Sequence, residues 1–264
     1  MDYPGRIITV GESDTEIVRA VKQRLNEALG MADDSDLRMD PNNGSFGPKM
    51  KRAVQLFQAR NVDSSGQPLK QDGEVGSVTW SALFGLDTVP TRTETASPLL
   101  DVALRIAAEQ EAKKVREIPR NSNSGPEVDR YLQRVACPPG QAWCCAFVYW
   151  CIDEAASELG RANPMVRTAG CLDHWQRAAA SGATRFTTAR ALADLDLIHP
   201  GVIFIIDHGG GLGHTGFVER ISGGLLTTLE GNTDASRTRE GGGVYRLTRK
   251  IAEVNKGFVD YSAL

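Results

Sequence analysis

A polar stretch in the first half of the chain, LDTVPTRTETASP at residues 86–98, most constrains how this sequence can fold. It contains two prolines and four threonines and almost no apolar side chain that could pack into a core. Segments of this composition typically connect compact domains. We therefore expect a small domain at residues 1–86, a linker at 87–98 and a larger domain at 99–264.

The residues before the linker show three short amphipathic patterns with helical spacing. The first begins with Ser13 and Glu16 at the spacing of a capping box. The apolar faces of the three patterns are Val18, Val21, Leu25 and Leu29; Met50, Ala53, Val54 and Phe57; and Trp80, Leu83 and Phe84. Each helix alone would expose its apolar face, so we expect the three to pack against one another.

Two glycine-containing turns lead into the second and third helical patterns. One reads NGSFG and is followed by AVQLFQ at residues 53–58, and the other reads DGEVGSVTW. With these motifs, residues 13 to 85 resemble the peptidoglycan-binding domain of the three-helix type. Asn43 and Met50 stand where that family usually has Asp and Thr. The resemblance implies a small three-helix domain with peptidoglycan as its partner.

After the linker, helical patterns come first and strand patterns follow. The helical patterns cover residues 99–115, 128–135 and a stretch that starts near 142. Short segments rich in β-branched and aromatic residues follow at 202–206, 215–221, 225–231, 243–247 and 257–261, separated by glycine-rich turns. Helices followed by an antiparallel sheet predict an α+β domain.

Cys144 is the strongest candidate for a nucleophile among five cysteines. It lies at a predicted helix start after the turn-forming residues 138–140, where the helix dipole and unpaired N–H groups favour a thiolate and a lowered pKa. Cys145 points about 100° away on the same helix. We expect the other cysteines to be small buried hydrophobic residues: Cys137, Cys145, Cys151 and Cys171. The odd total of five cysteines and the lack of a CxxC pair argue against a disulfide framework.

A reactive thiol also needs a base and a group that orients this base. His199 precedes Pro200 in a predicted turn, and His174 with Cys171 would give two ligands of a zinc site that has no second pair. His208 and His214 flank a glycine-rich turn. We favour His214, because it leads directly into a strand that would hold it rigidly.

Glu230 and Asn232 lie on the strand after the one that holds His214. They are two residues apart, so a regular strand would place both on one face. Either could hold the His214 ring in one tautomer.

Three motifs then carry a second resemblance: WCCAFVYW at residues 143–150, GHTGFV at 213–218, and Glu-Gly-Asn at 230–232. With them, residues from about 99 to 264 resemble a CHAP (cysteine, histidine-dependent amidohydrolase/peptidase) domain, a papain-like α+β fold found in bacterial and phage lysins. The resemblance implies that Cys144 is the nucleophile and His214 the base. Pro200-Gly201-Val202 departs from the usual Pro-Gly-Asp. The calcium loop of some phage members is missing, so we expect no metal and no cofactor.

The resemblance also implies cleavage of an amide bond in the wall peptide, by an N-acetylmuramoyl-L-alanine amidase or a peptide endopeptidase. Trp143, Asp173 and Trp175 are expected to line the substrate cleft, although core packing explains the tryptophans equally well.

Composition and sequence pattern limit the partners. The chain has 30 Lys and Arg against 33 Asp and Glu, without the basic excess of a nucleic-acid binder. It has no apolar run of about 18 residues or more and no signal-peptide pattern at its start, so we expect no membrane insertion and no Sec signal. We expect synthesis in the cytoplasm, a monomer, and action at the peptidoglycan of the periplasm or cell wall after release or delivery.

Three hypotheses fit these features. The first is a lytic enzyme such as an endolysin, with a holin as its release partner. The second is an effector toxin with the same chemistry, which would be accompanied by an immunity protein. The third is a peptidoglycan-binding protein without catalytic activity.

Overall fold

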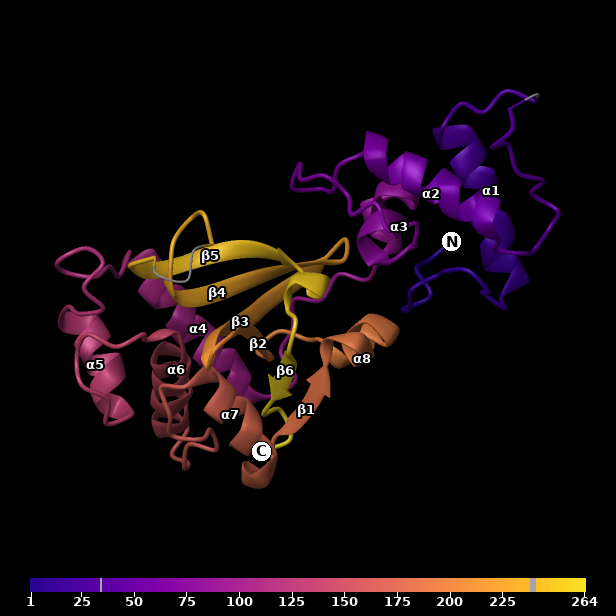
Figure 1. The fold of residues 1–264 in the computed structure, drawn as a ribbon. Coiled ribbons are helices and arrows are strands. Elements are labelled where there is room, and N and C mark those ends of the chain that lie inside the picture. Colours follow the sequence, from indigo (N-terminus) through magenta and orange to yellow (C-terminus); the bar gives the residue numbers. More distant parts are fainter. Residues whose placement is uncertain (34, 238–240) are drawn as a thin grey trace. The chain divides into compact units, whose positions relative to one another are not determined.

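A computed structural model describes residues 1–33, 35–237 and 241–264 of the chain (Figure 1). The chain divides into two compact units. The first consists of Met1–Thr91 with Leu192–Leu195 and Ser222–Gly224, and the second of Arg92–Ala191, Asp196–Ile221 and Leu225–Leu264. None of the helices within the described residues is long and apolar enough to cross a membrane.

Up to Thr91, the described residues of the first unit form three α-helices and a short 3-10 turn: α1 (Thr15–Ala28), α2 (Pro48–Arg60), α3 (Ser77–Phe84) and η1 (Leu86–Thr88). The predicted apolar faces supply its core, with Val18, Val21, Val54 and Trp80 fully buried. The predicted capping box is wrong by one residue. Asp14 caps α1 instead, because its carboxylate accepts hydrogen bonds from the N–H groups of Glu16 and Ile17, both at 3.1 Å.

A glutamine of the AVQLFQ motif bonds to the DGEVG turn that precedes α3. Gln58 on α2 is buried, and its amide nitrogen donates to Asp72 and to the carbonyl of Glu74, both at 2.9 Å. Its amide oxygen accepts from the N–H of Gly73 at 2.9 Å. Gly73 has a φ of 75°, which favours glycine, and an added Cβ would lie 2.5 Å from Lys51. One side chain thereby fixes the second turn against α2.

The elements after Thr91 form an α+β arrangement. The helices are α4 (Pro98–Ala112), α5 (Pro126–Arg134), α6 (Cys144–Glu158), α7 (Cys171–Arg177), η2 (Ala178–Ser181), α8 (Thr188–Ala193), η3 (Leu195–Leu197) and η4 (Ile251–Glu253). The strands are β1 (Thr184–Thr187), β2 (Ile203–Gly209), β3 (Leu212–Ser222), β4 (Leu225–Thr233), β5 (Gly243–Lys250) and β6 (Gly257–Asp260). The predicted fold class is confirmed. The sequence patterns did not include α8 or β1.

Within the described residues the strands form one six-stranded sheet in the order β1-β6-β2-β3-β4-β5. β2 and β3 are antiparallel neighbours, with Ile206 opposite His214. Where β2 turns into β3, Gly209, Gly210 and Gly211 all have positive φ values, of 79°, 60° and 80°, which glycine adopts without a steric penalty. This turn places His214 near the start of a strand that has neighbours on both sides.

The main core of the second unit lies between the helices α4 and α6 and one face of the sheet (Figure 1). Phe147 and Ile152 of α6 are fully buried, and they pack in one cluster with Ile203, Phe217 and Leu229 of the strands. Because its apolar residues anchor it along most of its length, α6 holds its first residue in a fixed place.

Candidate active site

Cys144 is the first residue of α6. The chain reaches it through a turn at Gly140, where φ is 85°, and Trp143 caps the helix without a side-chain hydrogen bond. The first N–H groups of a helix have no acceptor within the helix, and the positive end of its dipole lies there. Cys144 is 3% exposed, so the thiol lies at the enclosed start of a helix that is anchored in the core.

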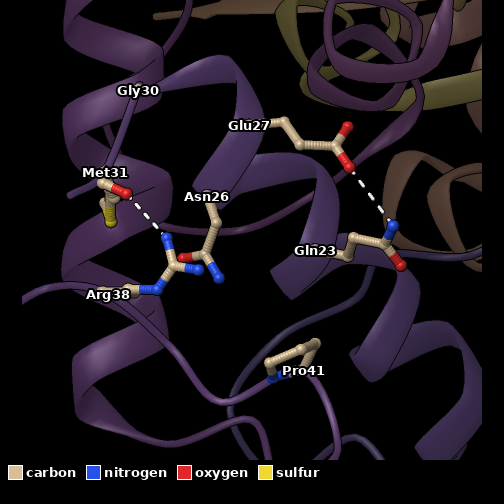
Figure 2. A pocket seen from close by; sticks show the side chains of 7 residues that line it. All are labelled: Gln23, Asn26, Glu27, Gly30, Met31, Arg38 and Pro41. Carbon is tan, nitrogen blue, oxygen red and sulfur yellow. Dashed lines mark hydrogen bonds between the residues drawn. The ribbon is translucent and has the colours of Figure 1, made fainter. Parts of the chain in front are cut away.

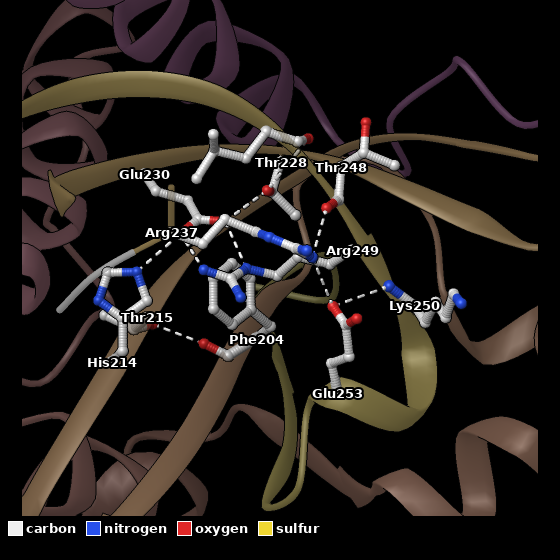
Figure 3. Close-up of polar contacts among 11 residues, drawn as sticks. Phe204, His214, Thr215, Thr228, Glu230, Arg237, Thr248, Arg249, Lys250 and Glu253 are labelled. Carbon is white, nitrogen blue, oxygen red and sulfur yellow. Dashed lines mark hydrogen bonds and ion pairs between the residues drawn. The ribbon is translucent and has the colours of Figure 1, made fainter. Parts of the chain in front are cut away.

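The ring of His214 is held by a carboxylate on the neighbouring strand β4 (Figure 3). Its Nε2 atom lies 2.7 Å from Oε2 of Glu230, and both side chains are almost completely buried. An ionised carboxylate can only accept, so Nε2 carries the proton of the neutral ring and Nδ1 has the lone pair. Nδ1 is buried and has no hydrogen-bond partner among the described residues. It is therefore the nitrogen left for a proton from the Cys144 thiol.

Glu230 is itself held by two side chains (Figure 3). Arg249 on β5 donates from Nε to Oε1 at 2.6 Å and from Nη2 to Oε2 at 2.7 Å. The hydroxyl of Thr228 donates to Oε1 at 2.5 Å. The planar guanidinium matches both carboxylate oxygens at once, which leaves the carboxylate one orientation. Arg249, Glu230 and His214 thus form a buried series of charge-assisted hydrogen bonds. This series orients the imidazole of His214.

These contacts shift two pKa values in opposite directions. Burial by itself raises the pKa of Glu230, but the hydrogen bonds and charges of Arg249 and His214 outweigh it and lower the pKa to about 2. Burial by itself lowers the pKa of His214, but its interactions with Cys144 and Glu230 outweigh this and raise the pKa to about 9. Glu230 therefore stays ionised at neutral pH. The pKa of about 9 favours the protonated ring there, so the neutral ring that accepts the thiol proton is the minor form below pH 9.

A second thiol, that of Cys171, lies against Cys144. The sulfur of Cys144 is 3.4 Å from the sulfur of Cys171, the first residue of α7. The Cys171 thiol and burial raise the pKa of Cys144, while His214 lowers it, and the net direction is upward. The prediction of a lowered pKa from the helix start alone is therefore wrong, because it took neither the burial of the thiol nor a neighbouring cysteine into account.

Asn232 makes no hydrogen bond with the ring of His214 in the described structure. Strand β4 is irregular between Glu230 and Thr233, and Asn232 has a φ of 56°, so the regular alternation along the strand is broken there. Its side chain is buried, and neither Nδ2 nor Oδ1 has a hydrogen-bond partner among the described residues. Of the two residues expected to orient the base, the structure brings Glu230 to the ring.

Trp143, expected in the substrate cleft, lies in the core. It is fully buried, its indole N–H donates to Oε1 of Glu117 at 2.9 Å, and its ring packs edge-on against Phe147. Oε2 of Glu117 is buried without a hydrogen-bond partner among the described residues.

Asp173 and Trp175 lie on α7, the helix that begins with Cys171. The carboxylate of Asp173 accepts a hydrogen bond from Arg177 at 2.9 Å, and the guanidinium of Arg185 lies 5.2 Å from the centre of the Trp175 ring. Trp175 also packs partly against the main core. The structure thus places both residues on the helix that adjoins Cys144, without a recorded hydrogen bond to the three residues Cys144, His214 and Glu230.

Two other histidines have partners of their own. His174 is fully buried, its Nε2 lies 2.9 Å from the hydroxyl of Tyr261, and burial lowers its pKa to about 4. His199 lies 3.1 Å from the carboxylate of Asp260; burial alone would lower its pKa, and the hydrogen bond to Asp260 raises it. In the described parts of the chain, no group of three or more His, Cys, Asp or Glu residues could hold a metal ion.

Comparison with family models assigns both parts of the chain. Residues 137–232 match the CHAP domain, and residues 14–83 match a putative peptidoglycan binding domain. The chain joins a peptidoglycan-binding domain to a CHAP domain. The CHAP match includes Cys144, His214, Glu230 and Asn232. Searches of curated proteins and of solved structures gave no match. The two domains together support a peptidoglycan hydrolase, and the CHAP domain indicates a cysteine- and histidine-dependent amidohydrolase or peptidase.

The peptidoglycan-binding domain has a pocket of about 550 Å³ between α1 and the loop that follows it, lined by both polar and apolar groups (Figure 2). Asn26 fixes this loop, because its amide bonds to both the carbonyl and the N–H of Met39, at 2.7 and 3.1 Å. Arg38 donates to the carbonyl of Met31 at 2.7 Å. The residues that line the pocket are Gln23, Asn26, Glu27, Gly30, Met31, Arg38 and Pro41.

Proposed function

We propose that this chain hydrolyses an amide bond in the peptide part of peptidoglycan, with Cys144 as the nucleophile and His214 as the base. One observation carries the proposal. The imidazole of His214 is bonded at Nε2 to Glu230, at 2.7 Å, its buried Nδ1 has no hydrogen-bond partner among the described residues, and Cys144 is among the causes that raise the pKa of the ring. A nucleophile, a base and a group that orients the base are the parts that acyl transfer requires.

The proposed reaction has two steps. Nδ1 of His214 takes the thiol proton, the sulfur of Cys144 attacks the amide carbonyl, and the ring then protonates the departing amine. In the second step His214 activates a water, which releases the acyl group from the sulfur. The N–H of Cys144, at the helix start, would stabilise the negative oxygen of the intermediate. The raised pKa of His214 favours transfer of the thiol proton to Nδ1. Burial and the Cys171 thiol raise the pKa of Cys144 and oppose this transfer.

The cleaved bond would be either the one between muramic acid and L-alanine, as in an amidase, or a bond within the stem or cross-bridge, as in an endopeptidase. We propose a lytic role such as that of an endolysin. The attached wall-binding domain supports an insoluble polymer as substrate, because tethering raises the local concentration of the enzyme. The pocket at Asn26 and Arg38 offers polar groups for the hydroxyl and amide groups of a wall fragment beside apolar surface, and we propose it as the place where wall fragments bind.

Release of soluble fragments from purified sacculi tests the proposal. Cys144→Ala is expected to abolish the release. Cys145→Ala is the matched control, since its neighbouring thiol is also fully buried on α6, and it should retain activity. An equal loss of fragment release in both variants would exclude Cys144 as the specific nucleophile. Mass spectrometry of the fragments released by the unmodified chain identifies the bond that is cleaved.

Glu230 and Asn232 can be separated in the same assay. Glu230→Gln removes the charge that holds Nε2 and should lower the rate by on the order of 10²-fold, within the range of general acid–base effects. It should also move the pH profile, because the Glu230 charge contributes to the raised pKa of His214. Asn232→Ala should leave the pH profile in place. A shift with Asn232→Ala, and none with Glu230→Gln, would reverse the two roles.

A further inference from the structure

Two thiols from different helices meet at the candidate nucleophile. The sulfurs of Cys144 and Cys171 lie 3.4 Å apart, and the two residues are 3% and 5% exposed. A disulfide bond needs a separation of about 2.05 Å, so the sulfurs would have to approach by roughly 1.3 Å. All five cysteines are free in this structure. Cys171 has no part in the proposed hydrolysis, yet it is placed against the atom that performs it.

Packing on both sides of α7 holds Cys171 in this place. An added Cβ at Gly213, on β3, would lie 3.0 Å from Cβ of Cys171, so glycine there allows the helix to approach the strand closely. One turn later, the buried ring of His174 bonds to Tyr261 at 2.9 Å and stacks on it. The contact between the two thiols is therefore built into the packing of α7.

We propose that Cys144 and Cys171 form a reversible disulfide when the protein meets hydrogen peroxide, and that this bond switches hydrolysis off. The loss of activity rests on the proposed role of Cys144 as nucleophile, whereas formation of the bond does not.

The chemistry balances with one peroxide for each pair of thiols. The Cys144 thiolate attacks one peroxide oxygen, an S–O bond forms, the O–O bond breaks, and the departing hydroxide takes the former thiol proton from His214 to become water. The sulfur of Cys171 then attacks the sulfur of Cys144, the S–S bond forms, and the hydroxyl leaves as a second water with the Cys171 proton. Two thiols lose two electrons, and the peroxide gains them.

The neighbouring thiol would also protect the nucleophile. A sulfenic acid without a partner is oxidised further to a sulfinic acid, which dithiothreitol does not reduce. A disulfide to Cys171 intercepts the sulfenic acid, and a dithiol restores both cysteines. The pair would thus convert an irreversible loss of activity into a reversible one.

The test uses the full chain, exposed to a small excess of hydrogen peroxide that is then removed with catalase. Trypsin separates residues 135–161 from residues 168–177, and fragmentation of the linked peptides by mass spectrometry locates the bond. We expect a bond between Cys144 and Cys171, an at least tenfold fall in fragment release from sacculi, and recovery with dithiothreitol.

Two variants sharpen the test. Cys171→Ala should lose activity to peroxide without recovery in dithiothreitol, whereas Cys151→Ala, which removes another buried thiol of α6, should recover like the unmodified chain. The proposal is overturned if no link forms, if the link joins Cys145 to Cys171, or if Cys171→Ala recovers fully. Mapping in the unmodified chain decides the matter even if Cys171→Ala does not fold. If Cys144→Ala remains active, the proposed function fails, while the mapped bond still decides whether the disulfide forms.

Discussion

Arg249→Met removes the guanidinium that fixes Glu230. The substitution abolishes two hydrogen bonds, of 2.6 and 2.7 Å, and keeps an apolar side chain in the space of the arginine stem. The side chain of Arg249 is 8% exposed and that of Glu230 is fully buried. After the change the carboxylate still contacts His214 and Thr228, but it loses the partner that contributes most to its lowered pKa.

The expected loss of stability is large. Removing one partner of a buried ion pair costs about 3–5 kcal/mol. Two hydrogen bonds to charged groups, at roughly 1.5–3 kcal/mol each, give a similar sum. A small domain has a total stability of about 5–15 kcal/mol, so the variant should unfold at a much lower urea concentration. Fragment release should fall as well, because the carboxylate that orients His214 is no longer held.

Urea unfolding followed by tryptophan fluorescence measures this effect, since Trp143, Trp150 and Trp175, three of the four tryptophans, lie in the second unit. Arg246→Met is the matched control on the same strand. Arg246 is 40% exposed and pairs with Glu219 and Glu111 at the surface, so its loss should cost at most about 1 kcal/mol. An equal or smaller loss of stability in Arg249→Met than in Arg246→Met would mean that the buried ion pair stabilises the protein no more than a surface pair does.

Three further predictions concern the pKa of Cys144, the pKa of His214 and binding to the cell wall. Cys171→Ala should lower the pKa of Cys144, because Cys171 is the main cause of its rise; the pH midpoint of iodoacetamide alkylation at Cys144 should move down, and an unchanged midpoint would contradict this. The folded-state pKa of His214, about 9 against an ordinary 6.5, adds stability that is complete below pH 6.5 and is lost as the pH rises through 9. The melting temperature of the protein should thus exceed that of His214→Gln by less at pH 9 than at pH 6.5; a constant difference would speak against it. Removing residues 1–91 from a Cys144→Ala chain should reduce sedimentation with sacculi, and equal sedimentation would exclude a wall-binding role for this part.

Local patterns were enough to predict most helices and strands in their order, but not helix α8 or strand β1. Only one of its four residues, Phe186, is buried, so it shows no repeated apolar spacing. It exists because it pairs with β6 at the far end of the chain, with Thr184 opposite Asp260. A strand that is stabilised by a distant partner gives little signal in its own sequence.

The candidate site, too, could be predicted from local patterns only in part. Motif spacing was enough to name Cys144, His214 and Glu230 as candidates. It was not enough to find Arg249 and Cys171, whose partners lie 19 and 27 residues away and are reached only through tertiary packing. A buried arginine requires a counter-charge, which points to Glu230, but only the structure shows that Arg249 is buried. The irregular end of β4 likewise broke the expected alternation that included Asn232.

Helix α6 links the thermal stability of the protein to its proposed catalysis. Its first residue is the candidate nucleophile, and Phe147, Val148, Ile152 and Ala155 along the same helix are all fully buried. A substitution that loosens these contacts would displace the sulfur from the imidazole before the unit as a whole unfolds. The upper temperature limit of hydrolysis would then be set by the packing of this helix, and variants with a tighter core around α6 should remain active at higher temperature.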